Sequence, residues 1–361
     1  MFSRYIEGEN KKTKEIVGKR MLYSTRVRRP NLIVSAGKAL FGSFFSPPQQ
    51  RRLSQTFRWQ LVEARKLTTD FKRRLAPTEA LITTWDSPKF GDDLPHMSPD
   101  LKVIAHCGGE VKTRFARPLF SRLTITNAAD PMARATAELG AAFLLYCARN
   151  VDFYRDKLKE KSNRIYEDMH LHGGSESVIG RTVAMIGFGR IGRALVDLLR
   201  GFDVNWLVHD PYVPRSWGQK YPVKFVDLQG LLPQAHLLVL TAALTDKTRG
   251  LLGKDNLAQL PDGAAVINIA LGGLVDLAAL KNEVRRGRLR CALDVTDPLE
   301  PLPIGDVLRT MRGAIVTPHI AGSGRHVREE IARVVIDDLE RFFHGKNVKN
   351  RVTTSMLARM T

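Results

Sequence analysis

The chain has 361 residues, of which 43% are hydrophobic, and a formal net charge of +19. This length exceeds what one hydrophobic core usually supports, so we expect two domains. No run of 18 apolar residues occurs, which excludes a membrane-spanning helix. The three cysteines (Cys107, Cys147 and Cys291) lie far apart, so we predict no disulfide framework and a reducing, cytoplasmic location.

Part of the charge lies in a basic N-terminal extension, residues 1–30, where nine Lys or Arg residues face three Glu residues. Such charge can attract nucleic acid, with an affinity that falls steeply with salt. The chain has no zinc-finger spacing, no helix-turn-helix signature and no basic stretch interleaved with aromatic residues. We therefore predict a solvated basic surface and do not expect nucleic acid as the main partner. No metal site is predicted, because no histidine spacing suits one.

From residue 31 to about residue 130, short apolar runs alternate with helical patterns. Strands are predicted at residues 31–35, 59–62, 80–84 and 101–105, and helices from residue 47 and over residues 69–75. Strands that alternate with helices indicate a parallel α/β sheet, so this part of the chain is predicted to form one small α/β unit.

A long helix is predicted over residues 131–150, with Asp130 as its N-cap and Pro131 at its first position. A polar stretch follows at residues 155–176. The later pattern predicts strands at residues 236–241, 264–269, 291–295 and 314–317, and an amphipathic helix over residues 325–343.

The most specific signal is the spacing G-x-G-x-x-G at Gly187, Gly189 and Gly192, which follows an apolar strand and opens a helix. The first glycine allows a tight turn, the second lets the backbone approach a pyrophosphate, and the third lets the helix pack on the strand. Asp210 comes 18 residues after Gly192, at the end of a second apolar strand. Its carboxylate suits the ribose hydroxyls of NAD and would repel the extra phosphate of NADP. We therefore predict an NAD-binding domain.

Further motifs follow this fingerprint in order. They are Asp210-Pro211-Tyr212, Leu244-Thr245-x-x-Thr248-Arg249-Gly250-Leu251-Leu252, Val266-Ile267-Asn268, Gly272-Gly273-Leu274-Val275-Asp276, Ala292-Leu293-Asp294-Val295 and Thr317-Pro318-His319-Ile320-Ala321-Gly322. With these motifs the chain, from about residue 31 onward, resembles the D-isomer-specific 2-hydroxyacid dehydrogenases. This family includes phosphoglycerate dehydrogenase and the glyoxylate/hydroxypyruvate reductases.

The resemblance implies an α/β fold of two Rossmann-like or flavodoxin-like domains, with the NAD-binding domain inserted into the substrate domain. The substrate (catalytic) domain would comprise residues 31–130 and 320–361, and the NAD-binding Rossmann domain residues 131–319. The resemblance also implies a homodimer.

The resemblance further assigns the proton transfer to a histidine. His319 matches the family's catalytic histidine, which takes a proton from the substrate hydroxyl in oxidation and returns it in reduction. Glu300 is the candidate for the glutamate that hydrogen-bonds the other ring nitrogen. Because Leu299 looks like a one-residue insertion before it, the alternative of a solvent-facing loop carboxylate stays open.

Leu271 departs from the family pattern, which has an arginine at this position. That arginine binds the carboxylate and carbonyl oxygen of the substrate through a charged fork of donors. Leucine supplies neither a donor nor a charge, and losing such a contact costs about 3–5 kcal/mol. We therefore expect Leu271 to leave the fold intact and to lower the rate with ordinary 2-oxo acids.

Gly108 and Gly109 align with the family's loop that binds the substrate carboxylate through backbone amides. The nearest basic residues in sequence are His106, Lys112 and Arg114, and we expect each to be a surface charge.

Cofactor contacts are also implied by the resemblance. They fall on the backbone of Arg190 and Ile191 at the pyrophosphate, Asp210 at the adenosine ribose, Asp294 at the nicotinamide amide, and on Thr241, Ala242, Ile269, Ala270, His319 and Gly322.

The sequence is compatible with two functions. One is an NAD-dependent oxidoreductase that interconverts a 2-hydroxy acid and a 2-oxo acid, favoured by the retained Asp210, Asp294, Glu300 and His319. The other is a catalytically impaired NAD(H)-binding regulatory or interaction protein of the same fold, favoured by Leu271 and the basic extension. NADH binding without turnover would distinguish the second from the first.

Overall fold

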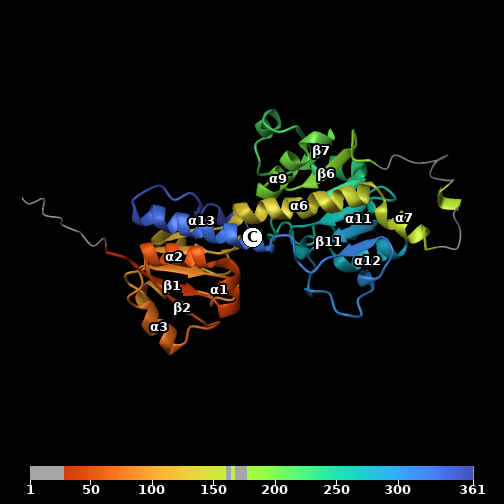
Figure 1. Ribbon diagram of the computed structural model, residues 1–361. Helices are drawn as coiled ribbons and strands as arrows, with labels where there is room; N and C mark the ends of the chain where they lie inside the picture. The colour runs from red at the N-terminus through yellow and green to blue at the C-terminus, as the bar shows by residue number, and fades with distance from the viewer. Residues whose placement is uncertain (1–27, 160–163, 167–176, 361) are drawn as a thin grey trace, which may run out of the picture.

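The computed structural model describes residues 28–159, 164–166 and 177–360. Nearly all of the basic extension, and most of the polar stretch at residues 155–176, lie outside the described residues. The described chain forms two lobes, each built around a mainly parallel sheet (Figure 1).

The first sheet has six strands in the order β13-β5-β4-β3-β1-β2. They are β1 (Asn31–Ser35), β2 (Arg58–Val62), β3 (Ala80–Thr83), β4 (Val103–His106), β5 (Thr124–Asn127) and β13 (Arg351–Val352). All pairs are parallel except that of β13 with β5. The parallel order 2-1-3-4-5 is flavodoxin-like, and ligands bind such sheets beyond the carboxyl ends of the strands.

The second sheet has seven strands in the order β12-β11-β10-β9-β6-β7-β8, and all its pairs are parallel. They are β6 (Thr182–Ile186), β7 (Asn205–His209), β8 (Val223–Phe225), β9 (Leu237–Leu240), β10 (Ala265–Asn268), β11 (Arg290–Leu293) and β12 (Ala314–Val316). This is the Rossmann order with one added strand, and the order reverses between β6 and β9. The predicted fold class is confirmed.

Helices cover both faces of each sheet. They are α1 (Lys38–Phe44), α2 (Pro47–Thr56), α3 (Thr69–Leu75), α4 (Leu94–Met97), α5 (Leu119–Arg122), α6 (Ala129–Ala148), α7 (Val151–Lys157), α9 (Arg190–Leu198), α10 (Leu228–Leu231), α11 (Lys254–Ala258), α12 (Leu277–Arg285) and α13 (Arg325–Phe343). None of these described helices combines the length and apolarity that a membrane crossing needs.

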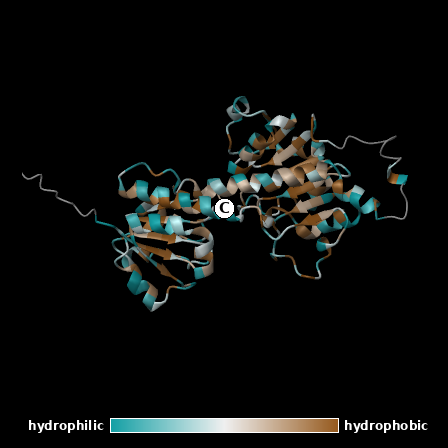
Figure 2. Cartoon of the chain, viewed as in Figure 1, coloured by the Kyte–Doolittle hydropathy of each residue, from teal (hydrophilic) through white to brown (hydrophobic). Residues whose placement is uncertain are grey.

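Alternate residues of a strand enter separate cores, as strand geometry requires. On β6, Val183 and Met185 pack with α6 and α9, whereas Ala184 and Ile186 pack with α11 and α12. The same division places Leu32 with α1 and α13, and Ile33 with α3. Figure 2 shows hydrophobic strands in both sheets, and helices along which hydrophilic and hydrophobic residues alternate.

Helices α6 and α13 connect the two lobes. Helix α6 runs from one lobe to the other, and it packs on α9 and on α13 (Figure 1). The chain that left the first lobe therefore returns to it as α13, which packs on α1 and β4. The active-site loops described below lie where these two helices begin.

The prediction that Asp130 caps the long helix is wrong. The N-cap is Ala128, and Asp130 lies in the first turn of α6. Its carboxylate forms an ion pair with Arg190 Nε of α9 at 2.5 Å. Asp130 is therefore bound to the neighbouring helix, and its negative charge still lies at the favourable end of the helix dipole.

Candidate active site

His319 and Glu300 lie together. His319 Nδ1 is 2.8 Å from Glu300 Oε1, and the Glu300 side chain is 33% exposed. Burial raises the pKa of Glu300, while the adjacent imidazole acts in the opposite direction. Leu299, which precedes Glu300, is exposed, and its carbonyl accepts a hydrogen bond from Thr296 Oγ1 at 2.6 Å. In this loop conformation the Glu300 carboxylate reaches the histidine.

The loop that carries His319 is held by the buried side chain of Asp294. Asp294 Oδ1 accepts hydrogen bonds from Thr317 Oγ1 at 2.6 Å and from the Ile320 amide at 2.8 Å, and Oδ2 accepts one from the Ala321 amide at 2.9 Å. The His319 amide also donates to the Asp294 carbonyl at 2.9 Å. His319 has a φ of +56°, an uncommon backbone state outside glycine that surrounding bonds must maintain. Asp294 therefore positions His319, in addition to its predicted cofactor contact.

Leu271 lies in the loop that follows β10. It is partly exposed, in extended backbone just after β10, and Asn268 Nδ2 donates to its carbonyl at 2.9 Å. A Cβ on the next residue, Gly272, would overlap the carbonyl group of Thr296. The loop of Leu271 therefore packs closely against the backbone at Thr296, four residues before Glu300.

The glycine turn has the shape that a dinucleotide needs. Gly187 has a φ of +93°, and a Cβ there would lie 2.5 Å from the backbone of Ala242. A Cβ on Gly192 would lie 2.9 Å from the Gly187 carbonyl oxygen, whereas a Cβ on Gly189 would meet open space. Packing therefore requires glycine at positions 187 and 192. Gly189 instead leaves open space directly before α9. Room at a helix N-terminus suits a pyrophosphate, so the residues present fit NAD.

The other predicted cofactor residues surround this turn. Asp210, after β7, accepts hydrogen bonds from the amides of Phe188 at 2.7 Å and Tyr212 at 2.9 Å. Thr241 Oγ1 donates to the Gly187 carbonyl at 2.6 Å. Arg190 and Ile191 open α9, Ala242 contacts Gly187, and Ile269 and Ala270 follow β10. These positions bring the predicted set together at the switch point between β6 and β9.

The predicted substrate loop follows β4 and faces the His319 loop. A Cβ on Gly109 would lie 3.9 Å from Met132 Sδ, and a Cβ on Gly322 would lie 3.1 Å from Met132 Cε. Met132 of α6 therefore separates the two loops. Among the described residues, no acceptor is bonded to the amides of Gly108 and Gly109. Both N–H groups are therefore candidates for binding a substrate carboxylate.

Two of the three basic residues near this loop differ from expectation. His106 is fully buried, because β4 is an interior strand, and burial lowers its pKa to about 3. Arg114 is half-buried, and its guanidinium donates to the carbonyls of Trp85 at 2.6 Å and Ser87 at 3.3 Å. Only for Lys112 is the expected exposed position confirmed. Neither His106 nor Arg114 replaces the missing arginine, since His106 is uncharged and Arg114 is already bonded.

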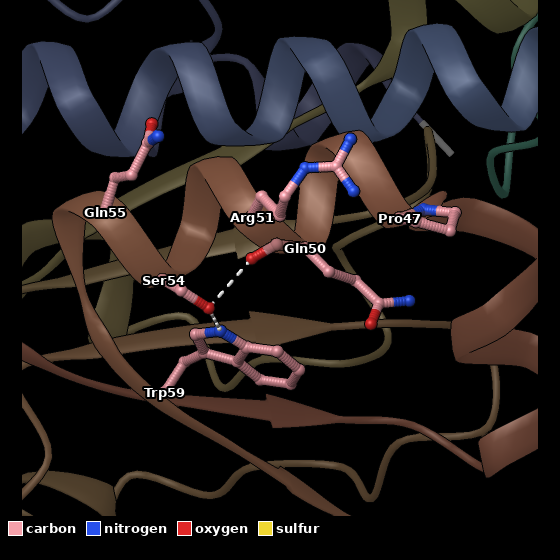
Figure 3. A pocket seen from close by; sticks show the side chains of 6 residues that line it. All are labelled: Pro47, Gln50, Arg51, Ser54, Gln55 and Trp59. Atoms are coloured by element: carbon pink, nitrogen blue, oxygen red, sulfur yellow. Dashed lines mark hydrogen bonds between the residues drawn. The ribbon is translucent and has the colours of Figure 1, made fainter.

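A surface hollow of about 510 Å³ lies elsewhere, over α2 and the edge strand β2 (Figure 3). Its lining residues are Pro47, Gln50, Arg51, Ser54, Gln55 and Trp59. Ser54 Oγ accepts from Trp59 Nε1 at 2.8 Å and donates to the Gln50 carbonyl at 3.0 Å. No carboxylate or imidazole lines the hollow, so it offers no acid–base chemistry.

Comparison with known proteins decides the family. Residues 141–321, half of the chain, match the family model described as "D-isomer specific 2-hydroxyacid dehydrogenase, NAD binding domain". The chain belongs to this family. Its second lobe, with the glycine turn and His319, is thus an NAD-binding domain of the 2-hydroxyacid dehydrogenase type.

Relatives extend the similarity to the first lobe. The chain is 29% identical to the hydroxypyruvate reductase of Thermotoga maritima over 287 residues, 78% of this chain and 90% of that protein. It is 28% identical to the D-3-phosphoglycerate dehydrogenase of Archaeoglobus fulgidus over 281 residues, 77% of this chain but only 52% of that protein. The chain thus spans about half the length of such phosphoglycerate dehydrogenases. The TT0316 protein of Thermus thermophilus superposes with a TM-score of 0.70 at 28% identity, covering 90% of this chain and all of that structure.

Sequence reasoning missed three residues of this 2-hydroxyacid dehydrogenase site. Thr317 anchors Asp294, Met132 separates the two loops, and Trp85 lies beside Gly108, with Nε1 2.9 Å from a Cβ built there. Thr317 lies within the His319 motif, so the sequence pattern could have indicated it. Met132 and Trp85 belong to distant segments that only the fold brings together.

Proposed function

We propose that the protein is an NAD-dependent oxidoreductase that interconverts a 2-hydroxy acid and a 2-oxo acid. The observation that carries this proposal is the contact of 2.8 Å between His319 Nδ1 and Glu300 Oε1, in the NAD-binding domain of a 2-hydroxyacid dehydrogenase fold. A binding protein without chemistry has no need for a carboxylate that stabilises an imidazolium.

His319 is the acid and base of this proposal. Glu300 occupies Nδ1, so Nε2 is the ring nitrogen left for the substrate. In oxidation, Nε2 accepts the hydroxyl proton, and the Glu300 carboxylate stabilises the cation that forms. In reduction, Nε2 returns this proton to the carbonyl oxygen. The nicotinamide ring of bound NAD supplies the hydride acceptor or donor.

Other residues bind and orient. The amides of Gly108 and Gly109 are proposed to hold the substrate carboxylate, and Asp294 keeps His319 in its left-handed backbone state. The turn from Gly187 to Gly192 is proposed to hold the pyrophosphate, and Asp210 the adenosine ribose. A homodimer in the cytoplasm is part of the proposal, as the family resemblance and the three free, buried cysteines suggest.

Leu271 favours a second candidate function, an NAD(H)-binding regulatory or interaction protein without turnover. Leucine stands where the family pattern has a cation, in a loop whose next residue, Gly272, packs against the backbone of Thr296 and Asp297. The fold and cofactor turn would be retained in such a protein, and only the chemistry would be lost.

NADH oxidation with a panel of 2-oxo acids separates the two candidates. The panel is glyoxylate, hydroxypyruvate, 3-phosphohydroxypyruvate and phenylpyruvate, and wild type is measured beside Leu271→Arg. The first proposal expects wild-type turnover with at least one acid. NADH binding with turnover only in Leu271→Arg would favour the second candidate, because it would show an intact scaffold lacking the substrate cation.

A further inference from the structure

Arg328 is a charged residue of the first lobe whose guanidinium has no polar partner among the described residues. It lies in the first turn of α13, nine residues after His319. Its Nε is fully buried and makes no hydrogen bond. The neighbouring Arg325 instead contacts Glu329 at 3.4 Å, and Arg333 contacts Asp337 at 3.0 Å. The residue as a whole is only partly buried. A buried donor atom without a partner calls for an explanation, and a ligand bound by this guanidinium would supply one.

Aromatic rings hold this guanidinium in place. Arg328 Cζ lies 5.4 Å from the Trp85 ring centre and 5.8 Å from that of Phe44. The backbone of Trp85 is fixed in turn by Arg114, which donates to its carbonyl at 2.6 Å. Stacking on aromatic rings restricts the guanidinium without occupying its N–H donors, and the planar fork of these donors matches a carboxylate.

The same tryptophan adjoins the loop of Gly108. A Cβ on Gly108 would lie 2.9 Å from Trp85 Nε1 and 2.6 Å from His106 Nε2. His106 Nδ1 is bonded to Thr83 Oγ1 at 2.9 Å, while the buried Nε2 has no partner in the described part of the chain. A second unsatisfied polar atom is thus directed at the loop whose own amides are unbonded.

The local electrostatics favour an anion at this edge. The N-terminus of α13 contributes the positive end of a 19-residue helix, and its first turn contains no acidic residue. The cations nearer Leu271 and α9 are already paired, Arg249 with Asp297 at 3.4 Å and Arg190 with Asp130 at 2.5 Å. Arg328 is therefore placed to supply a charge that these residues do not.

We propose that Arg328 binds the carboxylate of the 2-oxo acid, together with the amides of Gly108 and Gly109, and supplies the positive charge that Leu271 lacks. This inference rests on the proposed function. It moves the substrate cation from the NAD-binding lobe to α13 of the substrate lobe, where it approaches the carboxylate from the side of Trp85. The carbonyl end of the substrate would then face His319 Nε2, the ring nitrogen that Glu300 leaves open.

Oxamate binding to the enzyme–NADH complex tests the inference. Oxamate has the planar shape of a 2-oxo acid and is not reduced, so calorimetry reports binding without turnover. Arg328→Met is expected to weaken oxamate about 100-fold, with NADH affinity unchanged. Arg325→Met, which removes an exposed arginine three residues earlier, is the matched control and should bind oxamate as wild type does. Leu271→Arg in the Arg328→Met background should restore most of the affinity, because it returns a cation to the family's own position.

Each outcome decides between the two proposals. Oxamate binding that Arg328→Met leaves unchanged, in an enzyme that turns over, overturns the inference alone. Oxamate binding that depends on Arg328, in a protein without turnover, supports the inference and overturns the proposed function. Wild type that neither binds oxamate nor turns over overturns both. A loss in Arg328→Met that Leu271→Arg does not repair, with a lowered Tm, assigns Arg328 a structural role and also overturns the inference.

Discussion

Replacing His319 by asparagine will lower kcat for 2-oxo acid reduction about 1000-fold and leave NADH affinity unchanged. The amide of asparagine can hydrogen-bond but cannot donate a proton as an imidazolium does. Asparagine also tolerates the left-handed backbone that His319 adopts at φ +56°, so the loop held by Asp294 should keep its shape. The measurement is kcat with saturating NADH, together with the NADH dissociation constant from fluorescence.

The control for His319→Asn is His326→Asn, which changes an exposed histidine near the start of α13. It should leave kcat unchanged. A His319→Asn variant that keeps more than about a tenth of wild-type kcat would show that another group transfers the proton.

Replacing Gly187 by alanine will destabilise the fold by about 3 kcal/mol and abolish NADH binding. The added Cβ would lie 2.5 Å from the Ala242 backbone, and the φ of +93° is unfavourable for any residue with a side chain. The turn follows β6 and Ala242 follows β9, which are paired interior strands of the sheet, so neither backbone can shift easily. The measurement is Tm by calorimetry and NADH affinity by fluorescence.

Gly189→Ala is the matched partner of this variant. A Cβ on Gly189 meets open space, so the free energy of unfolding should stay close to wild type. NADH should nevertheless bind about tenfold more weakly, because the methyl group occupies the space assigned to the pyrophosphate. Unchanged NADH affinity in Gly189→Ala would place the pyrophosphate elsewhere.

Local patterns sufficed for the elements with strong periodicity. The helix predicted over residues 325–343 is α13 with the same bounds, and the glycine spacing located the dinucleotide turn. Strand β13 was missed because it has two residues and exists only through its antiparallel pairing with β5. Its formation depends on a distant segment, so no local pattern can indicate it.

The candidate site also combines residues that a local motif indicated with residues that only the fold brings together. The His319 motif could be read from sequence, but its pairing with Glu300 depends on the conformation of the loop at residues 296–300, which the sequence left open. The burial of His106 and the stacking of Arg328 on Trp85 arise where β4, the chain after β3, and α13 meet. Burial and contacts between such distant segments are set by tertiary packing, which a single sequence does not display.

Direct hydride transfer is the most decisive measurement for the proposed activity. Wild-type enzyme is incubated with each acid of the panel and with NADH carrying deuterium at one or the other face of nicotinamide C4, and the product is analysed by mass spectrometry. The account predicts a 2-hydroxy acid with a single deuterium at C2 from one of the two labelled cofactors. NADH that binds but yields no labelled 2-hydroxy acid from any panel member would contradict it.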